Sequence, residues 1–212
     1  MSISTDHFIS FEGIDGCGKS TQAQLLHDFL ISHEQKVTFV REPGGTAISE
    51  AIRNILLDNN RQELADRTES LLMTASRAQL TQELIIPELD AGHWVIADRY
   101  ADSTLAYQGS GRNLDLEWLI QLNDFATYQI QPKITFLVDI DPAEGQRRRS
   151  AENDRIEDEG LEFQKLVRIG YLKIAERFKN RIIVLDGHQS VDKLHNQIKS
   201  EISRSFNFEK NA

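Results

Sequence analysis

The chain has 212 residues, 40% of them hydrophobic, which is enough to fill one core without disulfide or metal staples. With 33 acidic against 24 basic side chains, its net charge of −9 argues against a general nucleic-acid binder. No apolar run is long enough to span a bilayer, so we expect no membrane partner. The single cysteine, Cys17, excludes an internal disulfide, and Met1 to Glu12 lack an export signal, so the cytoplasm is the expected compartment.

Short apolar segments alternate with longer helical patterns along the chain. We predict strands at Phe8 to Phe11, Val37 to Val40, Trp94 to Ala97, Ile134 to Val138 and Ile182 to Leu185. Three intervening segments carry apolar residues at helical spacing, which predicts helices that each bury one face: Leu25, Leu26, Phe29 and Leu30; Ile48, Ile52, Ile55 and Leu56; and Leu71, Leu72, Ala75 and Ala78. The alternation predicts an α/β fold, a doubly wound parallel five-stranded sheet with helices on both faces.

No repeat or linker divides the chain, so residues 1–212 are expected to form a single domain. The segment at about 144–158 is rich in charges and poor in apolar anchors. It is expected to be exposed and mobile, either as a lid or as a solvated helix, and its composition alone favours the solvated helix.

A glycine-rich segment directly follows the first predicted strand and matches the pattern Gly, four residues, Gly-Lys-Ser/Thr. It comprises Gly13, Ile14, Asp15, Gly16, Cys17, Gly18, Lys19, Ser20 and Thr21. In such a loop, glycines let backbone N–H groups point at phosphates, and the following helix adds the positive end of its dipole. Lys19 is expected to contact the β and γ phosphates, and the Ser20 hydroxyl to bind Mg²⁺. The alternative, a turn without a ligand, is disfavoured because a strand precedes the loop and a helix follows it. The segment therefore predicts a P-loop NTPase-type site for a nucleoside triphosphate and Mg²⁺.

Two further features near this loop carry chemistry. The third predicted strand ends in Asp98 and Arg99, where Asp98 is expected to hold Mg²⁺ through water and Arg99 to clamp a second phosphate. A structural ion pair is the alternative. Cys17 lies close to a helix N-terminus and to Lys19, which favours a reactive thiolate, and a small buried filler is the alternative. No Asn-Lys-x-Asp sequence is present, which argues against a GTPase.

Four motifs, in order along nearly the whole chain, resemble those of the thymidylate kinase family, whose members transfer the γ-phosphoryl of ATP to dTMP. They are Phe11 to Gly16, Arg41 to Thr46, Asp98 to Gly109 and Asp154 to Glu157. The resemblance implies a cytoplasmic, Mg²⁺-dependent homodimer that binds ATP and dTMP. A kinase of another nucleotide and a nucleotide-dependent switch remain the alternatives.

The resemblance also implies roles around the thymine base. Arg77 would donate to O4, the amide of Gln108 would meet the N3 edge, and Thr104 would lie near the base. Met73 stands where the family usually presents a phenylalanine that stacks on thymine, and its thioether can still cover a ring face.

The sugar and phosphate contacts follow from the same resemblance. Tyr107 would lie where a 2′-hydroxyl would project, Asp15 would accept from the 3′-hydroxyl, and Arg53 with Arg99 would hold the monophosphate. Without the resemblance, surface ion pairs for Arg53 and Arg77 and a core position for Tyr107 would be expected.

The phosphate loop contains no arginine, which is typical of the bacterial type and leaves the transferring phosphoryl group to arginines of the lid. Arg147, Arg148 and Arg149 cannot all face one ligand, because successive helical residues are about 100° apart. We expect Arg149 first and Arg148 next to join Lys19 and Arg99 in catalysis.

Overall fold

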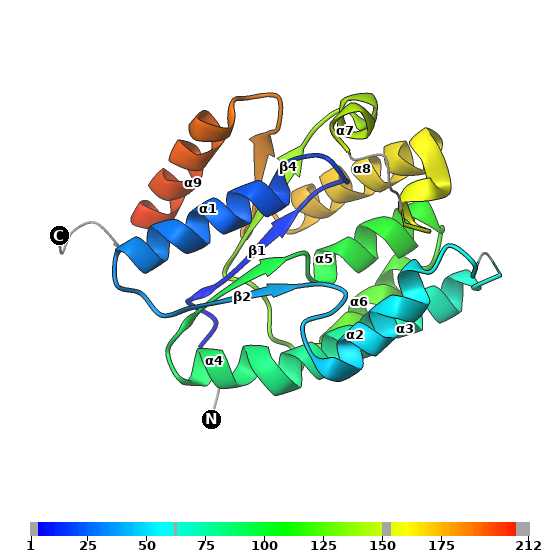
Figure 1. Cartoon of the computed structure of the whole chain (residues 1–212), viewed down its shortest axis with the longest axis horizontal. Helices are drawn as coiled ribbons and strands as arrows, with labels where there is room; N and C mark the ends of the chain where they lie inside the picture. The colour runs from blue at the N-terminus through cyan, green and yellow to red at the C-terminus, as the bar shows by residue number, and fades with distance from the viewer. Residues whose placement is uncertain (1–3, 62, 150–153, 207–212) are drawn as a thin grey trace.

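A computed structural model of the chain describes residues 4–61, 63–149 and 154–206. Its parallel strands form one sheet in the order β2-β3-β1-β4-β5 (Figure 1). The strands are β1 (Phe8–Glu12), β2 (Val37–Arg41), β3 (Trp94–Asp98), β4 (Ile134–Asp139) and β5 (Ile182–Asp186). The α-helices are α1 (Lys19–Ser32), α2 (Ala47–Leu57), α3 (Asp66–Leu80), α4 (Ile86–Asp90), α5 (Ala101–Thr104), α6 (Leu116–Ala126), α7 (Pro142–Arg148), α8 (Gly160–Arg177) and α9 (Val191–Phe206). Two π-helices, η1 (Thr81–Ile85) and η2 (Leu105–Gly111), and a 3₁₀ turn, η3 (Glu157–Glu159), complete the described part.

The five predicted strands and the predicted fold class are confirmed, with one consistent difference. Each strand continues one residue beyond its predicted end, and in every case that residue is charged: Glu12, Arg41, Asp98, Asp139 and Asp186. Because all the strands are parallel, these side chains come to one edge of the sheet, the carboxyl edge where ligands bind in such folds.

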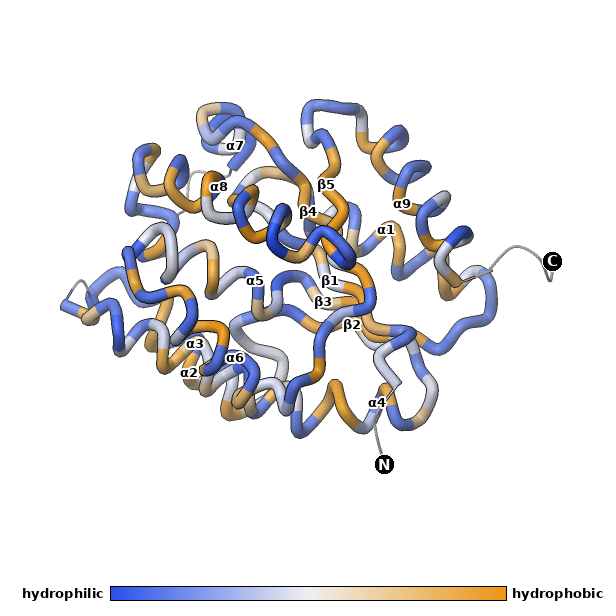
Figure 2. Tube along the Cα trace, turned by 180° about the vertical axis from the view of Figure 1, so that it is seen from behind, coloured by the Kyte–Doolittle hydropathy of each residue, from blue (hydrophilic) through white to orange (hydrophobic). Residues whose placement is uncertain are grey.

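Helices cover both faces of the sheet. On one face, Leu26 and Leu30 of α1 and Ile198 of α9 pack with strand residues, and Figure 1 shows these two helices side by side. On the other face, α8 and η2 pack over β4, while η1 and α4 pack beside β3. Figure 2 shows orange, hydrophobic segments among the strands between these layers, and the inner strands β1, β3 and β4 are buried along nearly their whole length.

The predicted burial of apolar faces holds for α1 but is wrong for parts of α2 and α3. Ile48 and Ile55 of α2 are 54% and 39% exposed, and Leu71 of α3 is 50% exposed. The face that α3 buries is polar instead and includes Glu69 and Arg77. It is buried because it lies against the site described below, which needs polar groups.

Part of the predicted lid lies outside the described residues, namely 150–153. On either side, α7 precedes this gap and Asp154 and η3 follow it. No helix in the described part of the chain is both long and apolar enough to cross a membrane.

Candidate active site

The loop between β1 and α1 has the backbone that its glycines predict. Gly13, Gly16 and Gly18 have φ values of 141°, 79° and 96°, a region that favours glycine. A Cβ on Gly13 would lie 2.6 Å from the carbonyl oxygen of Val138, so the loop packs tightly on β4. Within the described residues no side chain caps the N-terminus of α1, which leaves N–H groups of its first turn available to an anion.

The same loop also packs against α7, at the start of the predicted lid. A Cβ on Gly16 would overlap the carbonyl oxygen of Gly145, and one on Gly145 would lie 2.7 Å from that of Asp15. Backbone therefore contacts backbone here, and a movement of α7 toward the phosphate loop would displace the loop.

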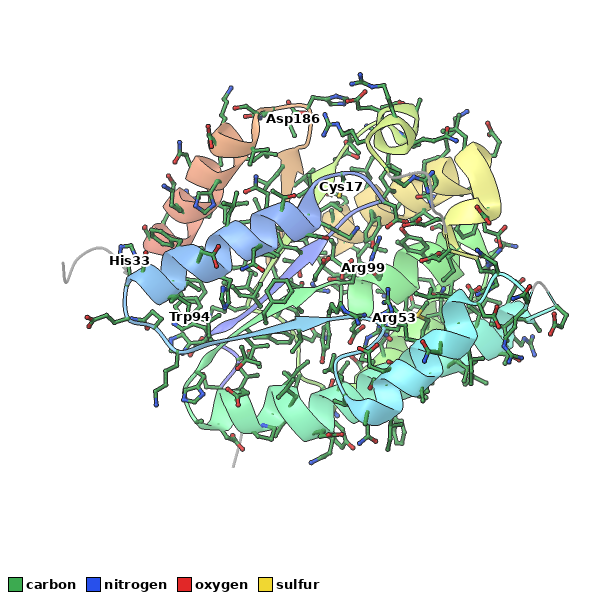
Figure 3. All side chains as sticks on the ribbon, in the orientation of Figure 1. Cys17, His33, Arg53, Trp94, Arg99 and Asp186 are labelled. Atoms are coloured by element: carbon green, nitrogen blue, oxygen red, sulfur yellow. The ribbon has the colours of Figure 1, made fainter. Side chains whose placement is uncertain are left out.

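A cavity of about 220 Å³ opens beside this loop at the carboxyl edge of the sheet. Eleven of the predicted site residues line it: Asp15, Lys19, Ser20, Arg53, Met73, Arg77, Asp98, Arg99, Thr104, Tyr107 and Gln108. In Figure 3, Arg53 and Arg99 lie at this end of the sheet, whereas Trp94 and His33 lie at the other. The fold thus brings together residues that are far apart in sequence.

The remaining predicted residues do not line the cavity. Gly13, Gly16 and Gly18 contribute backbone, and Thr21 is exposed in the first turn of α1. Ile14 and Cys17 are 2% and 1% exposed and belong to the apolar core. Burial raises the pKa of the Cys17 thiol, and the nearby Lys19 charge only opposes that shift. Of the two alternatives for Cys17, burial thus favours the small buried filler over the reactive thiolate, because desolvation outweighs the positive surroundings.

Asp15 is the anion at the centre of the cavity's polar wall. One of its oxygens pairs with Arg99 and lies 3.4 Å from Lys19 Nζ, and the other accepts from the Tyr107 hydroxyl at 2.9 Å. Burial by itself would raise the pKa of Asp15, but the charges of Arg99 and Lys19 hold it well below its usual range. The carboxylate thus keeps two cations side by side at the mouth of the phosphate loop.

The backbone of Arg99 has a φ of 73°, in the left-handed region that a non-glycine residue rarely adopts. Glu12 supports the turn, because its Oε1 accepts from the Tyr100 N–H at 2.7 Å and its Oε2 from the Tyr171 hydroxyl at 2.8 Å. The Tyr171 hydroxyl in turn contacts Arg99 Nη1 at 3.2 Å. Burial, assisted by the charge of Asp102, raises the pKa of Glu12 to about 7.

Arg77 is 2% exposed, and every one of its nitrogens has a protein partner. Nε and Nη2 pair with Glu42, Nη1 donates to Thr104 Oγ1 and Asn123 Oδ1, both at 2.8 Å, and Nη2 also donates to the Tyr100 carbonyl at 3.1 Å. A guanidinium has five N–H donors, so none is left over in this arrangement. Burial raises the pKa of Glu42, and the Arg77 charge opposes that shift.

Asp98 offers an oxygen that suits a hydrated cation. Its Oδ1 is buried and has no hydrogen-bond partner within the described residues, while the Ser20 hydroxyl also lines the cavity. Hydroxyl and carboxylate oxygens are the donors that Mg²⁺ prefers. No group of three or more His, Cys, Asp or Glu that could hold a metal occurs in the part of the chain described.

The three consecutive arginines at the C-terminal end of α7 differ in their contacts. Arg147 pairs with Glu144, and its side chain is 76% exposed. Arg148 donates to the same carboxylate at 2.7 Å and to the Gly187 carbonyl at 3.0 Å. Arg149 donates to the Glu157 carbonyl at 3.3 Å, and its buried Nε has no partner among the described residues. Neither Arg148 nor Arg149 lines the cavity in this arrangement.

Comparison with known proteins identifies the family. The sequence profile described as thymidylate kinase matches residues 11–198. The chain belongs to the thymidylate kinase family. It is 48% identical to the thymidylate kinase of Kosmotoga olearia over 92% of this chain and 94% of that protein. It is 50% identical to that of Thermosipho melanesiensis over 91% and 95% of the two chains. The crystal structure of thymidylate kinase from Ehrlichia chaffeensis superposes with a TM-score of 0.76 at 35% identity, covering 92% of this chain and 97% of that one.

The predicted family and the predicted enzyme class, a kinase and not a nucleotide-dependent switch, are thereby confirmed. For this thymidylate kinase family member, sequence reasoning assigned no role to four buried carboxylates: Glu12, Glu42, Glu69 and Asp102. Glu12 and Glu42 did give a signal, since each is charged and follows or ends a strand inside a motif. Glu69 gave none, because a glutamate in a helix is ordinarily solvated.

Proposed function

We propose that this chain is an ATP-dependent dTMP kinase, which transfers the γ-phosphoryl group of ATP to a phosphate oxygen of dTMP and yields dTDP. The observation that carries the proposal is the cavity itself. It combines Lys19 of the phosphate loop, the cations Arg53 and Arg99, and the amide of Gln108 in a member of the thymidylate kinase family.

Phosphoryl transfer here needs positioning and positive charge. The phosphate loop and the N-terminus of α1 hold the ATP phosphates, with Lys19 on the β and γ groups. Arg53 and Arg99 hold the phosphate of dTMP opposite Lys19, and Asp15 reduces the repulsion between Lys19 and Arg99. The attacking oxygen is already anionic, so the reaction requires no general base.

We assign Mg²⁺ to the Ser20 hydroxyl and, through water, to Asp98. The Oδ1 of Asp98, which has no hydrogen-bond partner in the described part of the chain, supports this assignment. When bound, the ion neutralises charge that develops on the transferring phosphoryl group.

The nucleoside fits the other end of the cavity. Met73 covers the base, Thr104 and Gln108 face its polar edge, and Arg77 orders Thr104 through its hydrogen bond. Tyr107, held by Asp15, fills the position that a 2′-hydroxyl would need and so favours deoxyribose.

We further propose that residues 1–212 act as one catalytic domain whose lid, at about 144–158, closes over ATP. Its arginines Arg149 and Arg148 supply charge to the transition state. Among the described residues, Arg149 Nε has no partner whereas Arg148 has two acceptors, which supports the place of Arg149 ahead of Arg148.

A homodimer is the proposed assembly, because apolar side chains gather outside the core on neighbouring helices. Ile48 of α2, Leu71 of α3 and Phe125 of α6 are 54%, 50% and 85% exposed. A second copy would cover such a surface. Neither nucleic acid nor membrane is a proposed partner, and the buried lone cysteine fits a cytoplasmic enzyme.

A substrate panel tests the function. Formation of ADP should depend on dTMP and exceed the rate with dCMP, dGMP and thymidine, while ATP alone should turn over slowly. Lys19→Ala should abolish the reaction, whereas Lys173→Ala, at an exposed lysine of α8, should not. Preference for another acceptor would indicate a kinase of that nucleotide, and ATP hydrolysis without an acceptor would contradict the proposal.

A further inference from the structure

Glu69 lies behind the nucleoside pocket and does not line it, yet it touches a residue that does. It is 1% exposed on α3, and its Oε1 accepts from Gln108 Nε2 at 2.9 Å. The same carboxylate accepts from Arg112 Nε and Nη2 at 3.2 and 3.1 Å and from Arg155 Nη2 at 2.6 Å. Glu69 therefore joins the pocket wall to two buried or half-buried guanidinium groups.

These contacts keep Glu69 ionised. Burial by itself would raise the pKa of this carboxyl, but the hydrogen bonds from Arg112 and Gln108 and the guanidinium charges lower it below its usual value. An ionised carboxylate can accept hydrogen bonds but cannot donate one. The side of the Gln108 amide that faces Glu69 must therefore be its NH₂ group.

The orientation of the amide then follows. With Nε2 turned to Glu69, Gln108 directs Oε1 away from that carboxylate, and no donor reaches Oε1 among the described residues. Gln108 itself lines the cavity. At this point the pocket consequently offers the Oε1 acceptor, while Glu69 takes one of the two N–H groups of Nε2.

We propose that Glu69 is a positioning residue that sets base selectivity by locking the Gln108 amide with its carbonyl oxygen toward the pyrimidine N3. This inference rests on the proposed dTMP kinase function. Thymine carries N3–H, a donor that matches Oε1, whereas the N3 of cytosine is an acceptor and would leave two acceptors facing each other. Arg77 has all its donors engaged within the protein, which increases the share of the discrimination that falls on Gln108.

Glu69→Gln is the direct test, because glutamine can present either NH₂ or oxygen. Its oxygen should take the place of Oε2, where Arg112 Nη2 and Arg155 Nη2 donate, because among the described residues Oε1 accepts from only one guanidinium nitrogen, Arg112 Nε, at 3.2 Å. Its NH₂ should therefore face Gln108. The Gln108 amide then turns over and offers a donor to the base. The measurement is the ratio of kcat/KM for dTMP to that for 5-methyl-dCMP, a pair that differs only at the N3 and C4 edge.

The ratio should fall by about 10- to 100-fold, through a loss with dTMP and a gain with 5-methyl-dCMP. Glu159→Gln is the matched control, since Glu159 also pairs with Arg112 but has no contact with Gln108. Its ratio should stay within about twofold of the parent's. If Glu69→Gln folds poorly, Glu69→Gln with Arg112→Gln removes one charge of each sign and takes its place, checked by circular dichroism.

A folded variant that keeps the parent's ratio would overturn the proposal, as would an equal loss with both nucleotides, which marks a merely structural role. A parent enzyme that does not phosphorylate dTMP would instead refute the proposed function.

Discussion

Replacing Arg77 by alanine should destabilise the protein before it affects base recognition. The substitution removes all the hydrogen bonds of a buried guanidinium and leaves Glu42, 6% exposed, without its counter-charge. Removal of one partner from a buried ion pair costs about 3–5 kcal/mol. For a chain of this length 1 kcal/mol shifts Tm by about 2–4 °C, so we expect Tm to fall by roughly 6–20 °C.

The loss should depend on pH in a definite direction. Burial already raises the pKa of Glu42 above its ordinary 4.5, and removal of Arg77 takes away the charge that opposes this. The folded variant then holds a proton that the unfolded chain has lost, so its unfolding free energy falls as pH rises above about 4.5. The deficit relative to the parent should be smaller near pH 5 than near pH 8.

The unfolding free energies of parent and variant are measured by urea unfolding at both pH values, without ligand, with circular dichroism as the signal. Arg77→Met combined with Glu42→Gln is the control, because it removes both charges and should recover much of the loss. An Arg77→Ala variant that melts within about 2 °C of the parent would show that the Arg77–Glu42 pair does not stabilise the fold. Any loss of dTMP use by Arg77→Ala must be measured at a temperature where the variant is folded.

Three other outcomes are expected. Arg149→Ala should lower kcat by about 10³-fold or more at saturating ATP and dTMP, with little change in KM. Arg147→Ala, at an exposed side chain, is the control and should keep the parent's kcat. If Arg149→Ala also keeps the parent's kcat, the segment is only a solvated helix. Cys17 should resist a bulky thiol reagent in the native protein and react in urea, as followed by mass spectrometry, and rapid native labelling would contradict its burial. Burial raises the pKa of Glu12 from 4.5 to about 7. As pH rises between those values, the unfolding free energy of the parent should therefore fall by up to about 3 kcal/mol relative to that of Glu12→Gln. A difference between the two proteins that does not change with pH would contradict this.

The local sequence predicts much of this fold because the relevant signals lie within a few residues. Apolar runs locate all five strands, and the glycines between Gly13 and Gly18 predict the positive φ values that the loop adopts. Strand, glycine loop and helix follow each other directly, so the phosphate site needs little information from elsewhere in the chain.

In α2 and α3, the spacing of apolar residues predicted the helices themselves but not which side of each helix is buried. Apolar spacing reports that a face avoids water and does not say what covers it. Leu71 is exposed in the single chain, whereas Arg77 of the same helix is buried. Only the packing of α3 against the cavity decides this.

The partners of the buried charges also depend on the tertiary structure. Asp15 meets Arg99 across 84 positions, and Glu69 meets Gln108 across 39. No local pattern links such pairs, because a carboxylate can form a surface ion pair or a buried junction with the same neighbours in sequence. Local sequence is thus sufficient to locate the phosphate loop, the strands and the set of polar residues available to the site. The fold decided which of those residues face the ligand and which hold others in place, because burial and hydrogen-bond geometry are fixed only when distant segments pack together.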